Sequence, residues 1–524
     1  MKPATLRFLG GVCGSLALVA ASARAEVKLP ALFIDHCVLQ RDQAVPVWGE
    51  AAPGEEVTVK FRAQVKTATA DAQGHWKLKL DPLPASAEPQ DLVVSASHPP
   101  PITIHDVLVG EVWVGSGQSN MAMMPWTFTN SDARLLEIWK GAPYPQIRQS
   151  HAGLNNGRWQ VATSINTFSA LLFTFGLRLH QELGVPVGLI VSAISGSASS
   201  CWLSEDALKA DAPCQAAIQK YSATFDFAKY DAAMRKYTGD LEQWKTASAE
   251  AQAQKQPAPP RPVRPVKPGE GSDGGVGCLY EAWVRPLQPY GIRGVLWDQG
   301  ESGTALEGVD QYTLMGALIR GWRRDWGEIP FVYFQKPSGG GCGWDPADPM
   351  FKFAEPFAPL PASAAPDDNG GSQIYNKIKI MTYPHTGMAS SSDLGAGTHP
   401  LNKSGYGRRA ADVALGMVYG KPVEYYGPIY DSHQVEGATV RVKFQHVGHG
   451  LAFKHGEKLQ GFAIAGADKV FHWADARIDG DTVVLSSEKV AKPVVVEYAW
   501  AAYRPWANLF NKDGLPAVPF RSDQ

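Results

Sequence analysis

The stretch VWVGSGQSNM, residues 112–121, joins a hydrophobic run to a glycine-rich turn and a serine. Its β-branched and aromatic residues predict a strand that is buried on both faces. Gly115 and Gly117 then predict a tight turn, because residues without a Cβ atom let the backbone bend sharply and let a ligand approach it. Ser119 follows this turn. Its hydroxyl is expected either at an exposed nucleophile position or in an ordinary helix cap.

Strands and helices alternate along the middle of the chain. Residues 168–183 carry apolar side chains at helical spacing, and Gly184 is a suitable residue to end that helix. Residues 185–192 then form a run typical of a buried strand. The alternation continues with a strand at 291–297, a helix at 312–326 and a strand at 331–335. This order predicts a parallel sheet with helices covering it.

Short hydrophobic runs separated by turn residues lie on both sides of this alternating region. Residues 26–105 are predicted to form an N-terminal β-sandwich domain, and residues 425–524 a C-terminal β region whose pairing with the first is left open. The central domain, 106–424, is interrupted by an insertion at about 203–277. In the insertion a helix expected at 211–250 precedes a Pro- and Gly-rich connector, a composition that cannot form a core.

The first 25 residues predict a signal peptide. Lys2 and Arg7 precede an apolar run that ends in the small-residue site Ala23-Arg24-Ala25. No later apolar run is long enough to span a bilayer, so the chain is expected to be exported and to have no membrane partner after cleavage.

Charge and cysteine content restrict the partners and the covalent structure. The net charge is −2 and no basic stripe is present, which argues against a nucleic-acid partner. Cleavage of the leader would leave an odd number of cysteines and thus at least one free thiol. One disulfide is left open among Cys201, Cys214, Cys278 and Cys342.

Several ordered blocks resemble the sialate O-acetylesterase-like branch of the SGNH hydrolases. They are GSGQSNM (115–121), the N-terminal segment 29–59, GVPVGLIVSAISGS (184–197), GVLWDQGESG (294–303), HTGMASSSDLGAGTHPLNKSGYGRR (385–409) and NLFNKDGLPAVPFRSD (508–523). The resemblance implies an α/β fold, an SGNH (flavodoxin-like) three-layer parallel-sheet core with flanking N- and C-terminal β-sandwich regions. It also implies ester hydrolysis by a serine nucleophile.

The resemblance assigns the catalytic roles. Ser119 matches the nucleophile, and His399 matches the base because its flanks fit the block HP-x-(N/D)-K. Asp393 is the expected acid, six residues before the histidine, although many relatives place the acid three residues before it. Glu301 and Asp298 are the fallback acids, and a dyad without an acid is left open. His385 is expected to be structural or to contact substrate.

Donors for the oxyanion are expected from three blocks. The backbone N–H of Ser119 is the default, and Gly196 matches the glycine of the second block. The third block has Gly303 where this branch has asparagine, so Gln299 could replace that donor or could simply cap backbone groups at a strand end. Further oxyanion or substrate contacts are expected from Gln118, Asn120 and Glu301.

These features together predict a secreted or periplasmic serine carbohydrate O-acetylesterase. An acetylated plant cell-wall glycan such as xyloglucan or xylan is the favoured substrate, on the basis of the altered third block and the insertion. The alternatives are a sialate O-acetylesterase and a non-catalytic carbohydrate-binding protein on a degenerate core. No cofactor and no metal are expected, since no metal-ligand or nucleotide-binding motif is present. The oligomeric state is not predicted.

Overall fold

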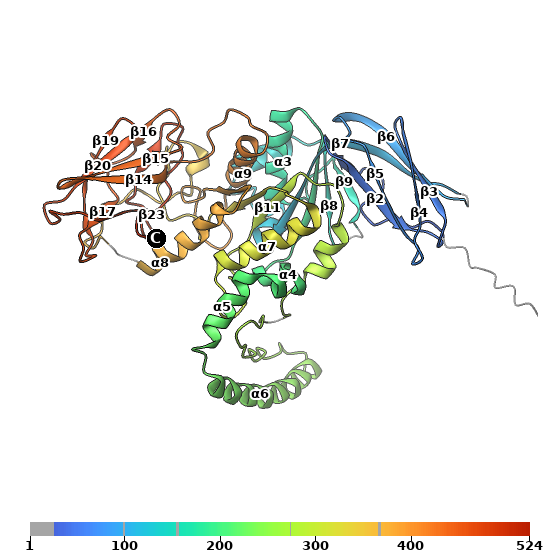
Figure 1. Cartoon of the computed structure of the whole chain (residues 1–524), viewed down its shortest axis with the longest axis horizontal. Helices are drawn as coiled ribbons and strands as arrows, with labels where there is room; N and C mark the ends of the chain where they lie inside the picture. Colours follow the sequence, from blue (N-terminus) through green and yellow to red (C-terminus); the bar gives the residue numbers. More distant parts are fainter. Residues whose placement is uncertain (1–25, 98–99, 154–156, 273, 365–367) are drawn as a thin grey trace, which may run out of the picture.

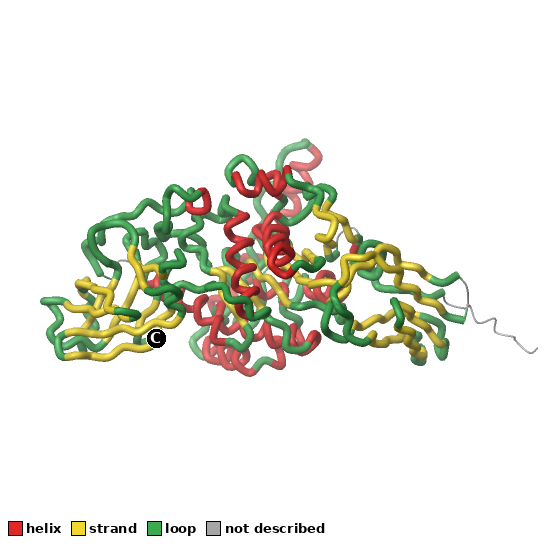
Figure 2. Tube along the Cα trace, turned by 90° about the horizontal axis from the view of Figure 1, so that it is seen from above, coloured by secondary structure: helices red, strands yellow, loops and turns green. Residues whose placement is uncertain are grey.

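The computed structural model describes residues 26–97, 100–153, 157–272, 274–364 and 368–524. The predicted signal peptide, 1–25, lies outside the described residues. The protein is a mixed α/β protein with a large mixed sheet and additional β-sheets. Figure 2 shows strands gathered at the two ends and most helices between them. None of the described helices is long and apolar enough to cross a membrane.

The central part of the large sheet has the strand order β13-β12-β11-β7-β10-β8-β9. Neighbouring strands from β13 to β8 run parallel, and only β9 is antiparallel to its neighbour. Their bounds are β7 (Ile102–Gly117), β8 (Tyr144–His151), β9 (Trp159–Ala162), β10 (Val187–Ala193), β11 (Gly294–Asp298), β12 (Phe331–Phe334) and β13 (Thr386–Ala389). The predicted parallel sheet is therefore confirmed.

Helices cover both faces of this sheet. Alternate strand residues point to opposite faces, and Trp113 and Leu189 pack in one core with helices α3 (Ala170–Leu183) and α9 (Lys403–Met417). Their sequence neighbours Val114 and Ile190 pack in a second core that includes helix α7 (Gln311–Trp326). Because both faces are buried, these strands have continuous hydrophobic runs instead of alternating patterns.

The remaining short elements connect the sheet to its surroundings. They are α1 (Ser119–Ala122), η1 (Pro125–Thr127), α2 (Ala133–Lys140), η3 (Ser199–Trp202), η4 (Tyr280–Val284), η5 (Arg285–Leu287), η6 (Pro349–Phe351), α8 (Asp368–Ile378) and η7 (Lys379–Thr382). Of these, α1 and η3 follow directly from the ends of central strands and carry or border the candidate site.

Short strands occupy the N-terminal end; the first of them pairs parallel with β7, and the others pair antiparallel with their neighbours. They are β1 (Val38–Gln40), β2 (Val45–Glu50), β3 (Glu56–Phe61), β4 (Gln64–Thr69), β5 (His75–Leu80) and β6 (Ser86–Ser95). Strand β6 pairs with the first half of β7, whereas the second half of β7 lies inside the central sheet. The predicted boundary at 105/106 falls within this one continuous strand.

The C-terminal strands form sheets of their own at the opposite end of the molecule (Figure 1). They are β14 (Ile429–Glu436), β15 (Thr439–Gln445), β16 (Leu451–Phe453), β17 (Phe462–Ala465), β18 (His472–Trp473), β19 (Asp475–Asp479), β20 (Thr482–Ser486), β21 (Val495–Tyr498), β22 (Leu509–Asn511) and β23 (Phe520–Arg521). The alternative that they pair with the N-terminal strands is wrong, because the central domain separates the two ends.

The insertion forms an arm that extends from the central domain (Figure 1). It contains α4 (Glu205–Ala210), α5 (Ala212–Ser222) and α6 (Phe227–Ala253). Helix α6 has no buried residue, and the Pro-rich connector returns along it. The indole Nε1 of Trp244 donates to the carbonyl of Pro259 at 2.8 Å, and the guanidinium of Arg261 lies 5.8 Å from the ring centre. The connector is thus held by an aromatic side chain of the helix.

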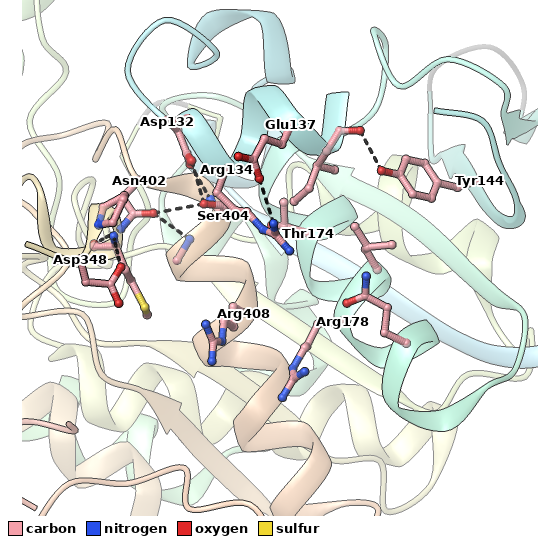
Figure 3. A pocket seen from close by; sticks show the side chains of 17 residues that line it. Asp132, Arg134, Glu137, Tyr144, Thr174, Arg178, Asp348, Asn402, Ser404 and Arg408 are labelled. Carbon is pink, nitrogen blue, oxygen red and sulfur yellow. Dashed lines mark hydrogen bonds and ion pairs between the residues drawn. The ribbon is translucent and has the colours of Figure 1, made fainter. Parts of the chain in front are cut away.

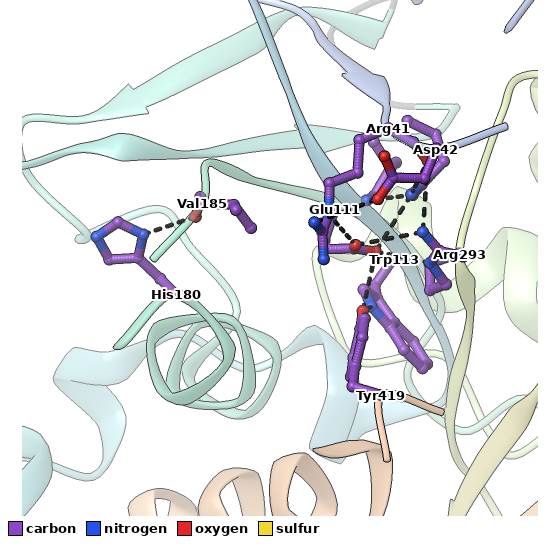
Figure 4. Close-up of polar contacts among 10 residues, drawn as sticks. Arg41, Asp42, Glu111, Trp113, His180, Val185, Arg293 and Tyr419 are labelled. Atoms are coloured by element: carbon purple, nitrogen blue, oxygen red, sulfur yellow. Dashed lines mark hydrogen bonds and ion pairs between the residues drawn. The ribbon is translucent and has the colours of Figure 1, made fainter. Parts of the chain in front are cut away.

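A buried carboxylate on β7 ties distant segments together (Figure 4). Glu111 accepts hydrogen bonds from Arg41 at 2.5 Å, Arg293 at 2.8 Å and the hydroxyl of Tyr419 at 2.9 Å. Burial raises the pKa of Glu111, but the hydrogen bonds and positive charges of Arg293 and Arg41 outweigh burial and hold this pKa below its ordinary value. The carboxylate therefore stays charged and joins the N-terminal segment to β11 and to the end of α9.

The variant Glu111→Gln is expected to lower the free energy of unfolding by about 3 kcal/mol at neutral pH, because two arginines lose a buried partner. The folded-state pKa is lowered, so this stabilisation is present above the ordinary glutamate pKa and is lost as the pH falls through the folded-state value. Urea denaturation at several pH values measures both effects. The matched control is Glu137→Gln, which removes the exposed partner of Arg134 and should change little. Equal unfolding free energies for wild type and Glu111→Gln would contradict this role.

Candidate active site

The nucleophile turn lies where β7 leaves the sheet. Gly117 has a φ of 123°, and a Cβ atom there would overlap the carbonyl group of Asp298 at the end of β11. The next backbone N–H, from Gln118, donates to that same carbonyl at 2.9 Å. Ser119 then begins helix α1 and is 7% exposed. A glycine is required here because the turn is pressed against the neighbouring strand.

Ser119 and His399 lie close together at the carboxyl ends of the parallel strands. The hydroxyl Oγ of Ser119 lies 2.9 Å from Nε2 of His399, although the two residues are 280 positions apart. His399 belongs to the segment between β13 and α9 and is an exposed residue. A hydroxyl within hydrogen-bond distance of an imidazole is the arrangement that general-base activation of a serine requires.

Asp393 is not brought to this histidine. Its carboxylate is fully buried and pairs with Arg409 of helix α9 at 3.0 Å. Arg409 also donates to the carbonyl of Ser390 at 3.4 Å, so the pair fastens the loop before His399 to the helix after it. Within the described residues no carboxylate is hydrogen-bonded to His399, and this includes the fallback residues Glu301 and Asp298.

The variant Asp393→Asn is expected to act mainly on stability. It leaves the Arg409 guanidinium in a buried position without its carboxylate, which should lower the free energy of unfolding by about 3 kcal/mol. The turnover number of the folded variant should fall far less than the ~10⁴-fold typical of a lost triad acid. Thermal denaturation and esterase kinetics on the same preparation measure the two effects. A loss of activity of triad size at unchanged stability would assign Asp393 the catalytic role instead.

Glu301 is the centre of a network beneath the nucleophile turn. Its carboxylate accepts hydrogen bonds from the side-chain amides of Gln118 and Asn120, the latter at 3.2 Å, and from Lys336 Nζ at 2.6 Å. The Asn120 amide also donates to the carbonyl of Thr398 at 3.0 Å. Glu301, Gln118 and Asn120 therefore lie together, and their contacts fix the turn that carries Ser119 to the loop that carries His399. Their predicted oxyanion or substrate contacts stay predictions.

Two buried lysines of the network had no role in the sequence analysis. Lys403 Nζ donates to Asn120 Oδ1 at 2.5 Å, and Lys336 Nζ lies 2.9 Å from the Asp298 carboxylate. Burial lowers the pKa of Lys403 to about 7, although the nearby Asp298 carboxylate opposes this shift. Lys403 stands in the same HP-x-(N/D)-K block as His399, so its position was a usable signal, whereas Lys336 belongs to no recognised motif.

The other expected oxyanion residues lie at the same edge of the sheet. Gly196 is in an exposed turn after β10, whose end pairs with Gly117 of β7. The Gln299 amide donates to the carbonyl of Gly303 at 2.9 Å, and its oxygen accepts from Ser199. These contacts favour the alternative in which Gln299 caps backbone groups at the strand end. The donor roles of Gly196 and the Ser119 N–H stay predictions.

A cavity of about 620 Å³ opens between α2, α3 and α9 (Figure 3). Asp132 and Asn402 line it, and both point to the first turn of α9, where Asp132 accepts from Ser404 and Asn402 accepts from the Gly405 N–H at 2.7 Å. Asn402 follows His399 by three residues, yet neither Ser119 nor His399 lines this cavity. The cavity therefore lies beside the candidate site and not within it.

Known proteins resemble this chain over nearly its whole length. Human sialate O-acetylesterase is 26% identical over 95% of this chain and 93% of its own, and the mouse enzyme is 26% identical over 96% of both. The crystal structure of a carbohydrate acetylesterase from Xanthomonas citri matches with a TM-score of 0.70 and 28% identity, covering 95% of this chain and 100% of that one. No protein-family model matches the chain.

These full-length similarities, with a serine and a histidine in contact at the sheet edge, define a carboxylic ester hydrolase. The similarity extends through the N-terminal strands, the central sheet and the C-terminal strands alike. Within that class the chain is a sialate O-acetylesterase-like carbohydrate esterase.

Proposed function

We propose that the chain is an exported serine O-acetylesterase of the SGNH type, which removes acetyl groups from a carbohydrate through an acyl-serine intermediate. The observation that carries the proposal is the 2.9 Å contact between Ser119 Oγ and His399 Nε2. The flavodoxin-like three-layer core is supported by the parallel strands of the central sheet and by helices on both of its faces. The signal peptide at 1–25 and the division at 105/106 and 424/425 belong to the same proposal.

In the proposed reaction His399 acts as both base and acid. Its Nε2 takes the proton from Ser119 Oγ as that oxygen attacks the acetyl carbonyl, and backbone N–H groups of Ser119 and Gly196 stabilise the oxyanion. The tetrahedral intermediate collapses, the sugar oxygen leaves, and His399 returns the proton to it. Water, deprotonated by His399, then attacks the acyl-serine and releases acetate.

We take the catalytic unit to be a serine–histidine dyad. Its support is that Asp393 is bound to Arg409 and that Glu301 is surrounded by Gln118, Asn120 and Lys336. In place of a carboxylate, the network that joins Asn120 to the Thr398 carbonyl restrains the backbone next to His399. A dyad of this kind keeps the proton transfer and forgoes the electrostatic stabilisation of the imidazolium by an acid.

The substrate is proposed to be an acetylated plant cell-wall glycan such as xyloglucan or xylan. Its support is the long arm beside the central domain and the glycine at position 303, where this branch has asparagine. O-acetylated sialic acid is the second candidate, favoured because human and mouse sialate O-acetylesterases match over almost their full length. Both are acetylated carbohydrates, so they differ in the sugar and not in the chemistry.

Acetate release from acetylated xyloglucan, acetylated xylan and O-acetyl sialic acid tests the proposal, with Ser119→Ala as the blank. Release by wild type that disappears in the variant supports Ser119 as the nucleophile, and the ratio of kcat/KM values among the three identifies the sugar. If wild type binds a glycan but releases no acetate from any of them, the protein is a carbohydrate-binding protein and the proposed reaction is wrong.

A further inference from the structure

Two cysteines lie on neighbouring segments where the arm leaves and rejoins the central domain. Cys201 lies in η3, before the arm, and Cys278 lies after it. The N–H of Gly277 donates to the carbonyl of Ser200 at 3.0 Å, and the N–H of Leu279 donates to that of Cys201, also at 3.0 Å. These two bonds hold the segments side by side, so that Cys201 and Cys278 lie on directly neighbouring stretches of backbone.

The other three cysteines of the described residues lie in buried positions away from this pair. The thiol of Cys214 points to the carbonyl of Thr313 at 3.8 Å, and that of Cys342 to the carbonyl of Ala507 at 3.3 Å. Cys37 is buried in the N-terminal core against Tyr290. Cys278 alone among these five thiols is exposed, so it is the one that a dissolved oxidant can reach.

We propose that Cys201 and Cys278 form a disulfide under oxidising conditions. The oxidant is a small-molecule disulfide such as oxidised glutathione. The Cys278 thiolate attacks one of its sulfurs, forms a mixed disulfide and releases one glutathione thiol. The Cys201 thiolate then attacks the Cys278 sulfur and releases the second. The two protein thiols lose two protons and two electrons in total, and the glutathione disulfide is reduced to two thiols.

The bond would close residues 202–277 into a covalent loop, with both ends of the arm fixed to η3. This covalent restraint would also act on the candidate site, because the hydroxyl of Ser199 in η3 donates a hydrogen bond to the side-chain oxygen of Gln299, next to the end of β11. The reaction is expected to be slow at neutral pH, since partial desolvation and the neighbouring Cys201 raise the pKa of Cys278 to about 12, although the residue is accessible from solvent. Alkaline buffer should therefore accelerate the exchange.

The test is to incubate the purified full chain with oxidised glutathione in mildly alkaline buffer, quench with alkylating reagent under denaturing conditions, and map peptides by mass spectrometry without reduction. The expected result is a linked pair of peptides carrying Cys201 and Cys278, and two fewer alkylated cysteines than in the reduced protein. Oxidised wild type should also melt at a higher temperature than reduced wild type.

Cys278→Ser should abolish the linked pair and the shift in melting temperature, whereas Cys342→Ser should keep both. The proposal is overturned if both thiols remain fully alkylated after prolonged oxidation, or if Cys278 carries glutathione while Cys201 stays free. None of these measurements depends on esterase activity, so the result is independent of the proposed function.

Discussion

Replacing Ser119 with alanine is expected to reduce kcat for acetate release by about 10⁴-fold or more, with the fold unchanged. The variant lacks the only atom that could form the acyl-enzyme in the proposed reaction, so the remaining rate comes from substrate binding and the oxyanion donors. Initial rates with an acetylated glycan, together with the melting temperature, measure both the loss and the integrity of the protein.

The matched control is Ser432→Ala, which removes an exposed serine hydroxyl on β14 at the C-terminal end of the molecule. It should keep the wild-type rate. A Ser119→Ala protein that is folded and hydrolyses the same glycan within tenfold of wild type would show that another group attacks the ester.

The second large effect is expected for His399→Asn, which should lower kcat by a similar factor. Asparagine cannot accept the proton of Ser119 Oγ, so the hydroxyl would have to react without a base. Because the two residues act as one unit, adding His399→Asn to Ser119→Ala should cause little further loss. Kinetics of the two single variants and the double variant provide this comparison.

The control for the histidine is His385→Asn. His385 is exposed and precedes β13 at the edge opposite to the candidate site, and its φ of 49° is a conformation that asparagine tolerates. Its rate should match that of wild type. Losses that multiply in the double variant of Ser119 and His399 would mean that the two residues contribute independently, contrary to the dyad.

Local sequence signals predicted the central elements closely. The helix expected at 168–183 is α3 (Ala170–Leu183), and the helix expected at 312–326 is α7 (Gln311–Trp326). Hydrophobic periodicity and helix-capping residues are local signals, so they can be recognised in the sequence without knowing which other segments the helix packs against. The shared strand β7 was not predicted as one element, because its valines suit either sheet and only the pairing of β6 and β10 shows that it belongs to both.

Some contacts of the candidate site were likewise predicted from the sequence, and others became known only from the structure. Motif residues identified Ser119 and His399, and the structure brings them within 2.9 Å. The expected contact between Asp393 and His399 did not follow, since the partner of Asp393 is a guanidinium sixteen residues further on, which becomes its neighbour only when α9 packs on the sheet. Gln299 could equally have been a donor at the site or a cap, and its contacts with the Gly303 carbonyl and the Ser199 hydroxyl favour the cap.

The sequence alone determined the nucleophile turn and the alternation of strands and helices, because these depend on backbone preference and hydrophobic periodicity within short segments. Ser119 and His399 were predicted from the resemblance of their sequence blocks to a known family. Only the tertiary structure decided which charged side chains pair beneath the site and which two cysteines lie on neighbouring segments at the base of the arm. Such contacts join residues far apart in the chain, and short-range electrostatics and hydrogen bonds select them only after hydrophobic packing has brought the segments together.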